Sequence, residues 1–232
     1  MARRVPYLSG FFAIAVVCGL IDAACFLALG GVFAEVMTGN MALLAFQLGT
    51  GESIGGGSPV RYLVALAAFA VGALAGGLVQ RGPAVLYDRR LGFAIEAAIL
   101  VAATVVAVVT DAGDSGGGRN VTVALLCVAM GLQNALMRLH GVADLATNLT
   151  TVTYMAIVAD SSLARGANPR FLRRAGSIVL FIGGATLGAW LTRWGAAWPL
   201  IVATGVFLAA MVPILGSEPT GATDAVARPA TA

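Results

Sequence analysis

The sequence has no lysine and little charge of either sign. All 14 basic residues are arginines, the acidic residues number 11, and His140 is the one histidine in the 232-residue chain. Hydrophobic residues make up 59% of the chain and charged residues 11%, and the mean hydropathy is +0.91. A soluble domain of this size does not need so much apolar surface, so the composition predicts a polytopic membrane protein. The net charge of +3 does not indicate nucleic-acid binding, because the arginines lie at the ends of apolar runs.

Cysteine and histidine are too scarce to indicate a metal centre or a disulfide framework. Cys18, Cys25 and Cys127 lie inside apolar runs, where cysteine is typical of a small buried hydrophobic residue. The sequence has no Ser-His-Asp grouping, no zinc motif and no nucleotide-binding loop. We therefore expect no metal, no cofactor and no catalytic residues, and we do not expect an enzyme.

Six apolar runs are long enough to cross the ~30 Å of hydrocarbon in a bilayer at ~1.5 Å per helical residue. Two further apolar stretches, 38–49 and 150–163, reach about half a bilayer or a little more. The predicted fold is an all-α polytopic membrane bundle. It forms one membrane domain over residues 1–216, followed by a disordered cytoplasmic tail at 217–232. The six long runs cover residues 8–30, 60–80, 91–110, 120–139, 172–192 and 196–215.

The chain contains an internal repeat with an offset of 112 residues. The segment Gly19–Ala23 returns at Gly131–Ala135, and no gap is needed from Gly19 to Arg81. Matches of arginine, phenylalanine and threonine carry more weight in this biased composition than matches of glycine or alanine. The repeats cover about 8–110 and 120–215, and duplicated membrane units are common in transporters. Further pairs at this offset are Thr38 and Thr150, Arg61 and Arg173, Phe69 and Phe181, Gly72 and Gly184, and Gly76 and Gly188.

The placement of the arginines predicts the topology. If the two short stretches are re-entrant, 11 arginines fall on one side of the membrane and 3 on the other, whereas two spanning stretches give 9 against 5. The positive-inside rule favours re-entrant helices and cytoplasmic termini, although a shallow spanning helix stays open. The use of arginine alone suggests a bacterial source, and hence the inner membrane. Each repeat then has three full spans, so the second copy is inverted relative to the first.

The middle of the first span contains an acidic residue, Asp22, between apolar neighbours. An ionised carboxylate costs at least ~2.5–3.5 kcal/mol at that depth, so it must face protein or water, become protonated or find a donor. Its repeat counterpart is Asn134, which follows Gln133. One interpretation is a pathway or proton-coupling residue, and the other is a helix–helix hydrogen bond that fixes packing.

Short polar turns open the two short helices. Thr38 is a candidate N-cap, Gly39 allows close backbone approach, and Asn40 offers a donor and an acceptor; the second copy has Thr150 and Thr151. If the preceding segments 31–37 and 141–149 descend to the midplane, both helix N-termini point at the centre and suit a small anionic or neutral polar solute. The alternative is ordinary capping of two interfacial helices. Glu35 and Asp160 are expected to be solvated at the interface. Glu96 is expected to be more buried by its position, and its place about one turn past Leu91 leaves contact with the headgroups as an alternative.

Two groups of residues resemble the signatures of a known family. The first comprises Gly19–Ala23, Phe26–Gly30 and the Met-Thr-Gly-Asn motif at Met37–Asn40; the second comprises Met130–Ala135 and Thr147–Asp160. They are similar to the signatures of the YoaK family of uncharacterised bacterial integral membrane proteins. The resemblance covers about residues 8–215 and implies a location and about six spans, but no substrate. The family often has Thr-Gly in the second copy, where this chain has Thr150 and Thr151.

The inverted repeat and the polar residues at matching depths predict a transporter or channel for a small polar or anionic solute. Its expected partners are the lipid bilayer and an unknown small solute, with no nucleic acid, and the glycine-rich helix faces permit a homo-oligomer. The alternative is a non-transporting membrane scaffold or partner subunit. The pathway residues predicted are Asp22, Thr38, Gly39, Asn40, Gln133, Asn134, Thr150 and Thr151.

Overall fold

The structure, a computed structural model, describes residues 5–81, 89–114, 116–139, 150–162, 165–168 and 170–216. The predicted tail at 217–232 lies outside these residues. Within them the chain is all-helical, with eight α-helices, short 3₁₀ segments and no strand. The helices are α1 (Val5–Leu27), α2 (Met37–Thr50), α3 (Pro59–Arg81), α4 (Arg89–Val109), α5 (Gly116–Leu139), α6 (Thr150–Ala159), α7 (Phe171–Leu191) and α8 (Ala197–Gly216), with the 3₁₀ turn η3 (Thr192–Trp194) after α7.

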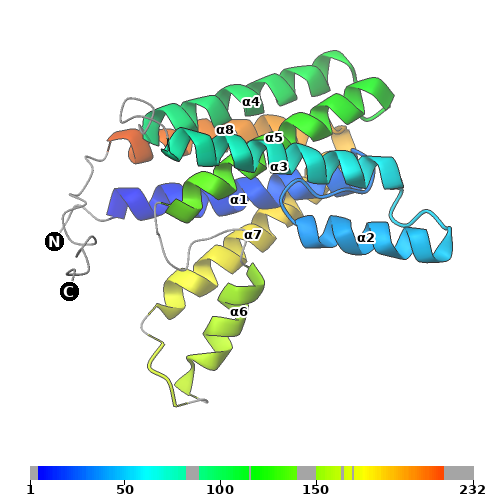
Figure 1. The fold of residues 1–232 in the computed structure, drawn as a ribbon. Coiled ribbons are helices and arrows are strands. Elements are labelled where there is room, and N and C mark those ends of the chain that lie inside the picture. Colours follow the sequence, from blue (N-terminus) through cyan, green and yellow to red (C-terminus); the bar gives the residue numbers. More distant parts are fainter. Residues whose placement is uncertain are drawn as a thin grey trace, which may run out of the picture.

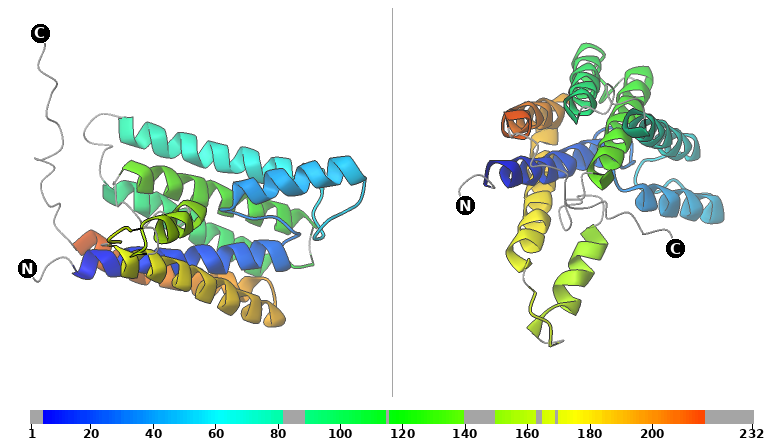
Figure 2. Two further views of the ribbon diagram at one scale, coloured as in Figure 1. Left: turned by 90° about the horizontal axis from the view of Figure 1, so that it is seen from below. Right: turned by 60° about the vertical axis from the view of Figure 1, so that its left-hand side comes forward.

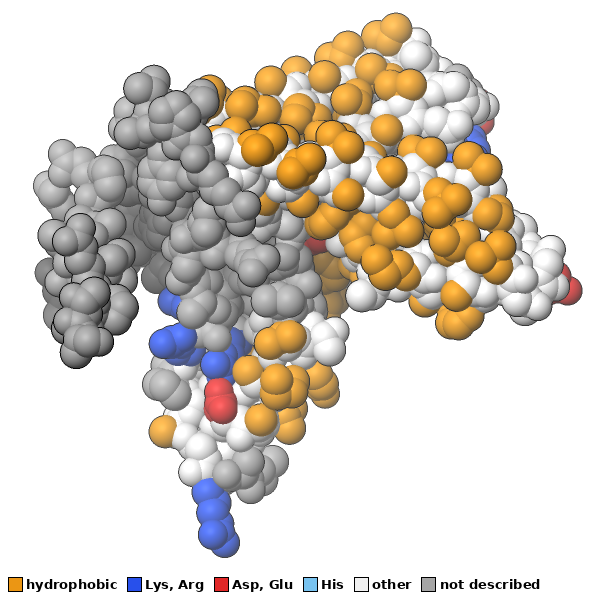
Figure 3. Space-filling model, viewed as in Figure 1, with side chains coloured by type: hydrophobic (Ala, Val, Ile, Leu, Met, Phe, Trp, Pro, Cys, Tyr) orange, Lys and Arg blue, Asp and Glu red, His pale blue; other side chains and the backbone are white. Residues whose placement is uncertain are grey.

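Among the described residues, four helices are long and apolar enough to cross a membrane, over Pro59–Val79, Leu91–Val109, Gly116–Met137 and Phe171–Trp194. Two shorter apolar stretches, Phe12–Leu27 and Ala197–Val212, belong to α1 and α8. Apolar side chains cover much of the visible outer surface of the bundle (Figure 3). That surface is suited to lipid, because a helix in hydrocarbon satisfies its own backbone hydrogen bonds and can expose apolar side chains. The composition and the structure therefore agree on a membrane protein.

The longer helices run back and forth along one common direction (Figures 1 and 2). The start of α1 and the end of α8 lie at the same end of the bundle. α1 and α5 are the most enclosed helices: Val17–Cys25 and Ala129–Asn134 are both buried without interruption. α1 packs mainly against α7 and α8, whereas α5 packs mainly against α3 and α4, and α1 and α5 touch each other only slightly.

Glycines at repeated positions bring the helix pairs into close contact. A Cβ on Gly19 would overlap the backbone of Phe181 and Ala185, and a Cβ on Gly131 would overlap the backbone of Phe69 and Ala73. The partners are themselves offset by 112 residues. The same correspondence holds for Gly72 against Val128 and Gly184 against Val16, and for Gly76 against Ala135 and Gly188 against Ala23. The sequence repeat thus forms two helix crossings with matching contacts.

The chain reverses direction after α1. Gly30 and Gly31 have φ values of 98° and 73°, which L side chains rarely adopt, and a Cβ on Gly31 would overlap the backbone of Gly55. The following residues run back along the bundle, and α2 starts partway along its length (Figure 1). α2 then ends near the end of the bundle where α1 ends and α3 begins. The segment between α1 and α3 therefore enters and leaves the bundle at one end.

The helix α6 lies apart from the central helices. It contacts α7 and projects with the start of α7 away from the rest of the bundle (Figures 1 and 2). α2 contacts α3 in the corresponding way in the first half of the chain. The predicted descending segment 141–149 lies outside the described residues. The predicted repeats at 8–110 and 120–215 correspond to α1–α4 and α5–α8.

Candidate functional site

Asp22 holds the segment that runs back into the bundle. It lies on α1 and is 4% exposed, and its Oδ1 accepts hydrogen bonds from the backbone N–H groups of Ala34 (2.8 Å) and Glu35 (2.9 Å). These N–H groups lie before the first turn of α2 and have no helical partner, so a buried carboxylate satisfies both. The other oxygen of Asp22, Oδ2, has no hydrogen-bond partner. One carboxylate oxygen of Asp22 thus anchors the segment through two hydrogen bonds, while the other oxygen has no partner.

Asn40 holds the same segment from the other side. Its Oδ1 accepts the N–H of Phe33 and its Nδ2 donates to the Phe33 carbonyl, both at 2.8 Å, so the amide pairs with Phe33 as a second backbone would. Gly39 leaves room for the Phe33 ring, which a Cβ would meet at 2.9 Å. The Phe33 ring also stacks on Phe26 with centroids 4.8 Å apart. Within the Met-Thr-Gly-Asn motif, Gly39 and Asn40 therefore secure the inward segment.

The predicted capping role of Thr38 is wrong. α2 begins at Met37, its N-cap is Val36, and no side chain caps it. Thr38 is exposed, whereas Asn40, two residues later, is 0% exposed. The helix therefore starts two residues earlier than a cap at Thr38 requires.

The second central helix contributes Gln133 and Asn134. Gln133 is 0% exposed and its Nε2 donates to Cys18 Sγ on α1 at 3.2 Å, which links the two central helices. Asn134 is 8% exposed and donates from Nδ2 to the Met130 carbonyl at 2.8 Å. Gln133 Oε1 and Asn134 Oδ1 are buried and have no hydrogen-bond partner. Like Asp22 Oδ2, both atoms are acceptors.

Two further acids are buried, which contradicts the expectation for Glu35 and agrees with the more buried position expected for Glu96. Glu35 is 5% exposed and Glu96, on α4, is 0% exposed, so Glu35 is not solvated at an interface. Glu35 interacts electrostatically with both Asp22 and Glu96. Neither oxygen of Glu96 has a hydrogen-bond partner, and no described arginine pairs with Glu96 or Asp22. Both acids had a sequence signal: Glu35 lies in the segment expected to descend, and Glu96 interrupts an apolar run.

The two short helices, α2 and α6, were expected to point at a common centre, but α6 does not lie beside the inward segment. Thr151 is exposed on α6, and α6 packs against α7. Thr150 starts α6, and its side chain lies outside the described part of the structure. Among the described residues, no hydrogen bond joins Thr151 to Asp22 or Asn40. The structure therefore brings Asp22, Glu35 and Asn40 together around one inward segment, without Thr151.

Most of the unpartnered polar atoms in the described interior are carboxylate and amide oxygens, beside the hydroxyl of Thr122. The described residues contain no group of three or more His, Cys, Asp or Glu side chains arranged to hold a metal ion. Instead, Asp22, Glu96, Gln133 and Asn134 all present buried oxygens with no partner. A buried acceptor without a donor costs about 1–3 kcal/mol, and more when it is charged. Protons on the carboxyls, water or a donor-bearing solute would satisfy these groups.

The fold and the buried polar interior define a membrane-type helical protein. The comparisons with known proteins give a more specific relationship. A family model described as "Protein of unknown function (DUF1275)" matches residues 10–213, and the chain belongs to this family. The YoaK-type resemblance of the two signatures is thereby confirmed, since that type is a member of the same family. Neither the curated proteins nor the solved structures searched give a match.

Proposed function

We propose that the protein is a transporter that moves a small polar solute through the membrane, coupled to protons held at Asp22. The observation that carries this proposal is the set of buried, unpartnered acceptors on α1, α4 and α5, among which Asp22 also binds the inward-running segment. Ionisable residues inside membrane segments commonly mark ion pathways and proton relays. Asp22 is the central member, because its Oδ2 is free while its Oδ1 holds the segment.

The proposed architecture has six spans and an inverted repeat. α1 has 23 residues and α8 has 20, which at ~1.5 Å each give ~34 Å and ~30 Å, enough to cross the hydrocarbon. The matching crossings around Gly19 and Gly131 support a pseudo-two-fold relation between the halves. α2 would then be a re-entrant helix, both termini would be cytoplasmic, and the membrane would be the bacterial inner membrane. In inverted-repeat transporters the substrate site lies near the midplane at the repeat interface.

The buried acids restrict the charge that we expect the solute to carry. Asp22, Glu35 and Glu96 disfavour an anion in the interior unless they are protonated, because like charges repel strongly where water is scarce. Acceptors without partners favour a solute that donates hydrogen bonds. We therefore place a neutral polar solute with N–H or O–H groups ahead of an anionic one.

Proton uptake into vesicles tests the proposal. Purified protein is reconstituted into vesicles that contain a pH-sensitive dye, and a potassium diffusion potential makes the interior negative. Amino acids, sugars, polyols and urea are then added one class at a time. We expect one class to cause internal acidification that protein-free vesicles lack, and Thr151→Ala, on the exposed face of α6, to behave as wild type. Absence of acidification with every class would contradict proton-coupled transport.

A second candidate is a non-transporting scaffold, and one observation favours it. Asp22 and Asn40 each make two hydrogen bonds to the backbone of the inward segment, so both have a structural role that needs no solute. In a scaffold the remaining acceptors would be satisfied permanently by protons on the carboxyls or by trapped water. If wild-type protein causes no internal acidification with any solute class, the result would support this candidate.

A further inference from the structure

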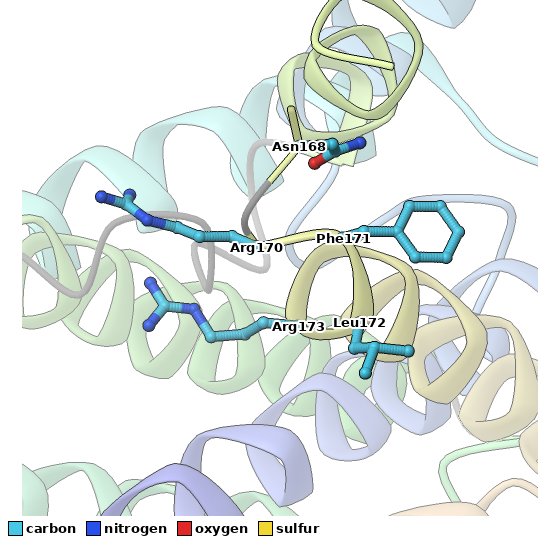
Figure 4. A pocket seen from close by; sticks show the side chains of 5 residues that line it. All are labelled: Asn168, Arg170, Phe171, Leu172 and Arg173. Atoms are coloured by element: carbon cyan, nitrogen blue, oxygen red, sulfur yellow. The ribbon is translucent and has the colours of Figure 1, made fainter. Parts of the chain in front are cut away.

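A surface hollow lies at the start of α7, on the part of the molecule that projects from the bundle. Its volume is about 470 Å³, and it is lined by Asn168, Arg170, Phe171, Leu172 and Arg173. Figure 4 shows the side chains of Arg170 and Arg173 extending in one direction, and those of Phe171 and Leu172 extending in the other. Both arginines already take part in other interactions, so the hollow does not offer two free charges to a ligand. The interior of the bundle offers a stronger candidate.

Glu96 is a buried acid that does not hold the inward segment. It lies on α4, is 0% exposed, and neither of its carboxylate oxygens has a hydrogen-bond partner. α4 is long and apolar enough to cross a membrane over Leu91–Val109, and Glu96 is the one charged residue in that stretch. An ionisable residue inside a membrane segment is costly, and it commonly marks a proton or ion pathway. Helix packing alone therefore does not account for Glu96.

The packing of α4 against α5 fixes the depth of Glu96. A Cβ on Gly92, one turn before Glu96, would meet the Leu136 side chain of α5 at 2.7 Å. A short connection joins the two helices and they run in opposite directions (Figure 1), so the next turn of α4 lies beside the residues that precede Leu136. One of these is Gln133, whose amide donates to α1 one turn before Asp22. Glu96 thus lies at a depth similar to that of Asp22, on a different helix.

The described surroundings of Glu96 supply no positive charge. α4 packs mainly against α5 and α8, and α8 contains no ionisable residue. The ionisable side chains that the structure describes on α5 are Arg119 and Cys127, and both lie more than one turn from the level of Glu96. The inward segment contributes Glu35, which interacts electrostatically with Glu96 and is itself an acid.

These surroundings suit a neutral carboxyl better than an ionised one. Burial of a carboxylate without a cation or a hydrogen-bond donor costs several kcal/mol, even after the protein relaxes. A protonated carboxyl carries no net charge and has an O–H donor of its own. Proton binding at Glu96 therefore removes most of this cost without a rearrangement of α4.

We infer that Glu96 is a second proton-binding site, separate from Asp22, and that its proton exchanges with water during the transport cycle. The inference rests on the proposed function for its role in transport. Asp22 stays the essential coupling site, and Glu96 adds a second proton for each solute moved. The two sites belong to different helices, α1 and α4, so each can be altered without removal of the other.

Infrared spectroscopy of the purified protein in detergent tests the site without any solute. A protonated carboxyl has a C=O band that a carboxylate lacks, and this band shifts in heavy water when the proton exchanges. We expect wild type at neutral pH to show such a band, which Glu96→Gln loses and Glu52→Gln, at an exposed acid after α2, retains. Glu96→Asp keeps a carboxyl, so it should keep a band at an altered frequency even if Glu96→Gln is unstable.

Two infrared results would overturn the inference. If Glu96→Gln keeps every protonated-carboxyl band of the wild type, Glu96 is ionised and binds no proton. If the band assigned to Glu96 does not shift in heavy water, its proton does not exchange and cannot be carried in a cycle. Both results are independent of whether the protein transports a solute.

The number of protons taken up per solute tests the role of Glu96 in transport. Radiolabelled solute and internal acidification are measured together in the vesicle assay, with the solute class that activates wild type. Glu96→Gln should lower the ratio of protons to solute by about half, because one of two proton-binding residues is lost. An unchanged ratio would overturn this role.

Two further outcomes of the vesicle assay are also decisive. If Glu96→Gln moves no solute, Glu96→Asp must restore the wild-type ratio because it keeps a titratable group, and failure to restore it counts against the inference. If wild type itself moves no solute, the proposed function fails, while the infrared band still decides whether Glu96 binds a proton.

Discussion

The hydrogen bonds of Asp22 predict that two substitutions of this residue differ sharply in their effect on stability. Asp22→Ala removes the acceptor of the Ala34 and Glu35 N–H groups and leaves two buried donors unsatisfied. Each such donor costs about 1–3 kcal/mol, so the variant should lose about 2–6 kcal/mol of folding free energy. Asp22→Asn keeps an oxygen in the place of Oδ1 and both hydrogen bonds, so its loss should stay below about 1.5 kcal/mol, the net value of one hydrogen bond.

Thermal unfolding in detergent measures this difference. Cys18, Cys25 and Cys127 are all buried, so a thiol-reactive fluorescent dye reports the opening of the bundle. For a chain of this size about 1 kcal/mol corresponds to about 2–4 °C, which places Asp22→Ala on the order of 5–20 °C below wild type and Asp22→Asn within about 6 °C. Equal melting temperatures for wild type, alanine and asparagine variants would refute the role of Asp22 as the anchor of the inward segment.

Three further substitutions test other parts of the structure. Asn40→Ala should lower the free energy of unfolding by about 1–3 kcal/mol, because both hydrogen bonds to Phe33 are lost; an unchanged midpoint in the thiol-dye assay would count against this. Gly131→Val should force α3 and α5 apart and so reduce the yield of folded protein in size-exclusion chromatography. Gly77→Val is the control, because the space around Gly77 is open and the yield should not fall. Equal yields for the two variants would contradict the close crossing of α3 and α5. Glu52→Cys, just after α2, should react with a membrane-impermeant maleimide added outside intact cells, and reaction only after lysis would exclude the re-entrant arrangement.

The sequence showed the 112-residue repeat, but it did not show which helices cross at the repeated glycines. The structure adds that Gly19 and Gly131 each lie against the backbone of a neighbouring helix, where a Cβ does not fit. The apolar runs predicted the helices with boundaries shifted by a few residues, because hydrocarbon length and backbone hydrogen bonding fix them. Asp22 and Asn40 were recognisable as unusual polar residues, and the structure adds which backbone groups they bind.

The partners of the buried acids could not be predicted, because they depend on three-dimensional packing. Glu35 was expected at a solvated interface, yet the reversal at Gly30 and Gly31 returns the chain into the bundle and buries it. Glu96 lies only a few residues from the start of α4, and periodicity does not reveal that α5 and α8 cover this helix. Thr38 resembled a cap, but the helix start depends on the inward segment that Asn40 holds. These residues act through contacts distant in sequence.

The measurement that most directly tests transport through this interior is proton uptake by the Asp22→Asn variant in the vesicle assay, with the solute class that activates wild type. The substitution keeps the hydrogen bonds of Oδ1 but removes the group that can gain and lose a proton. We expect a folded protein with nearly wild-type melting temperature and no solute-dependent acidification. Proton uptake at the wild-type rate by this variant would contradict a coupling role for Asp22.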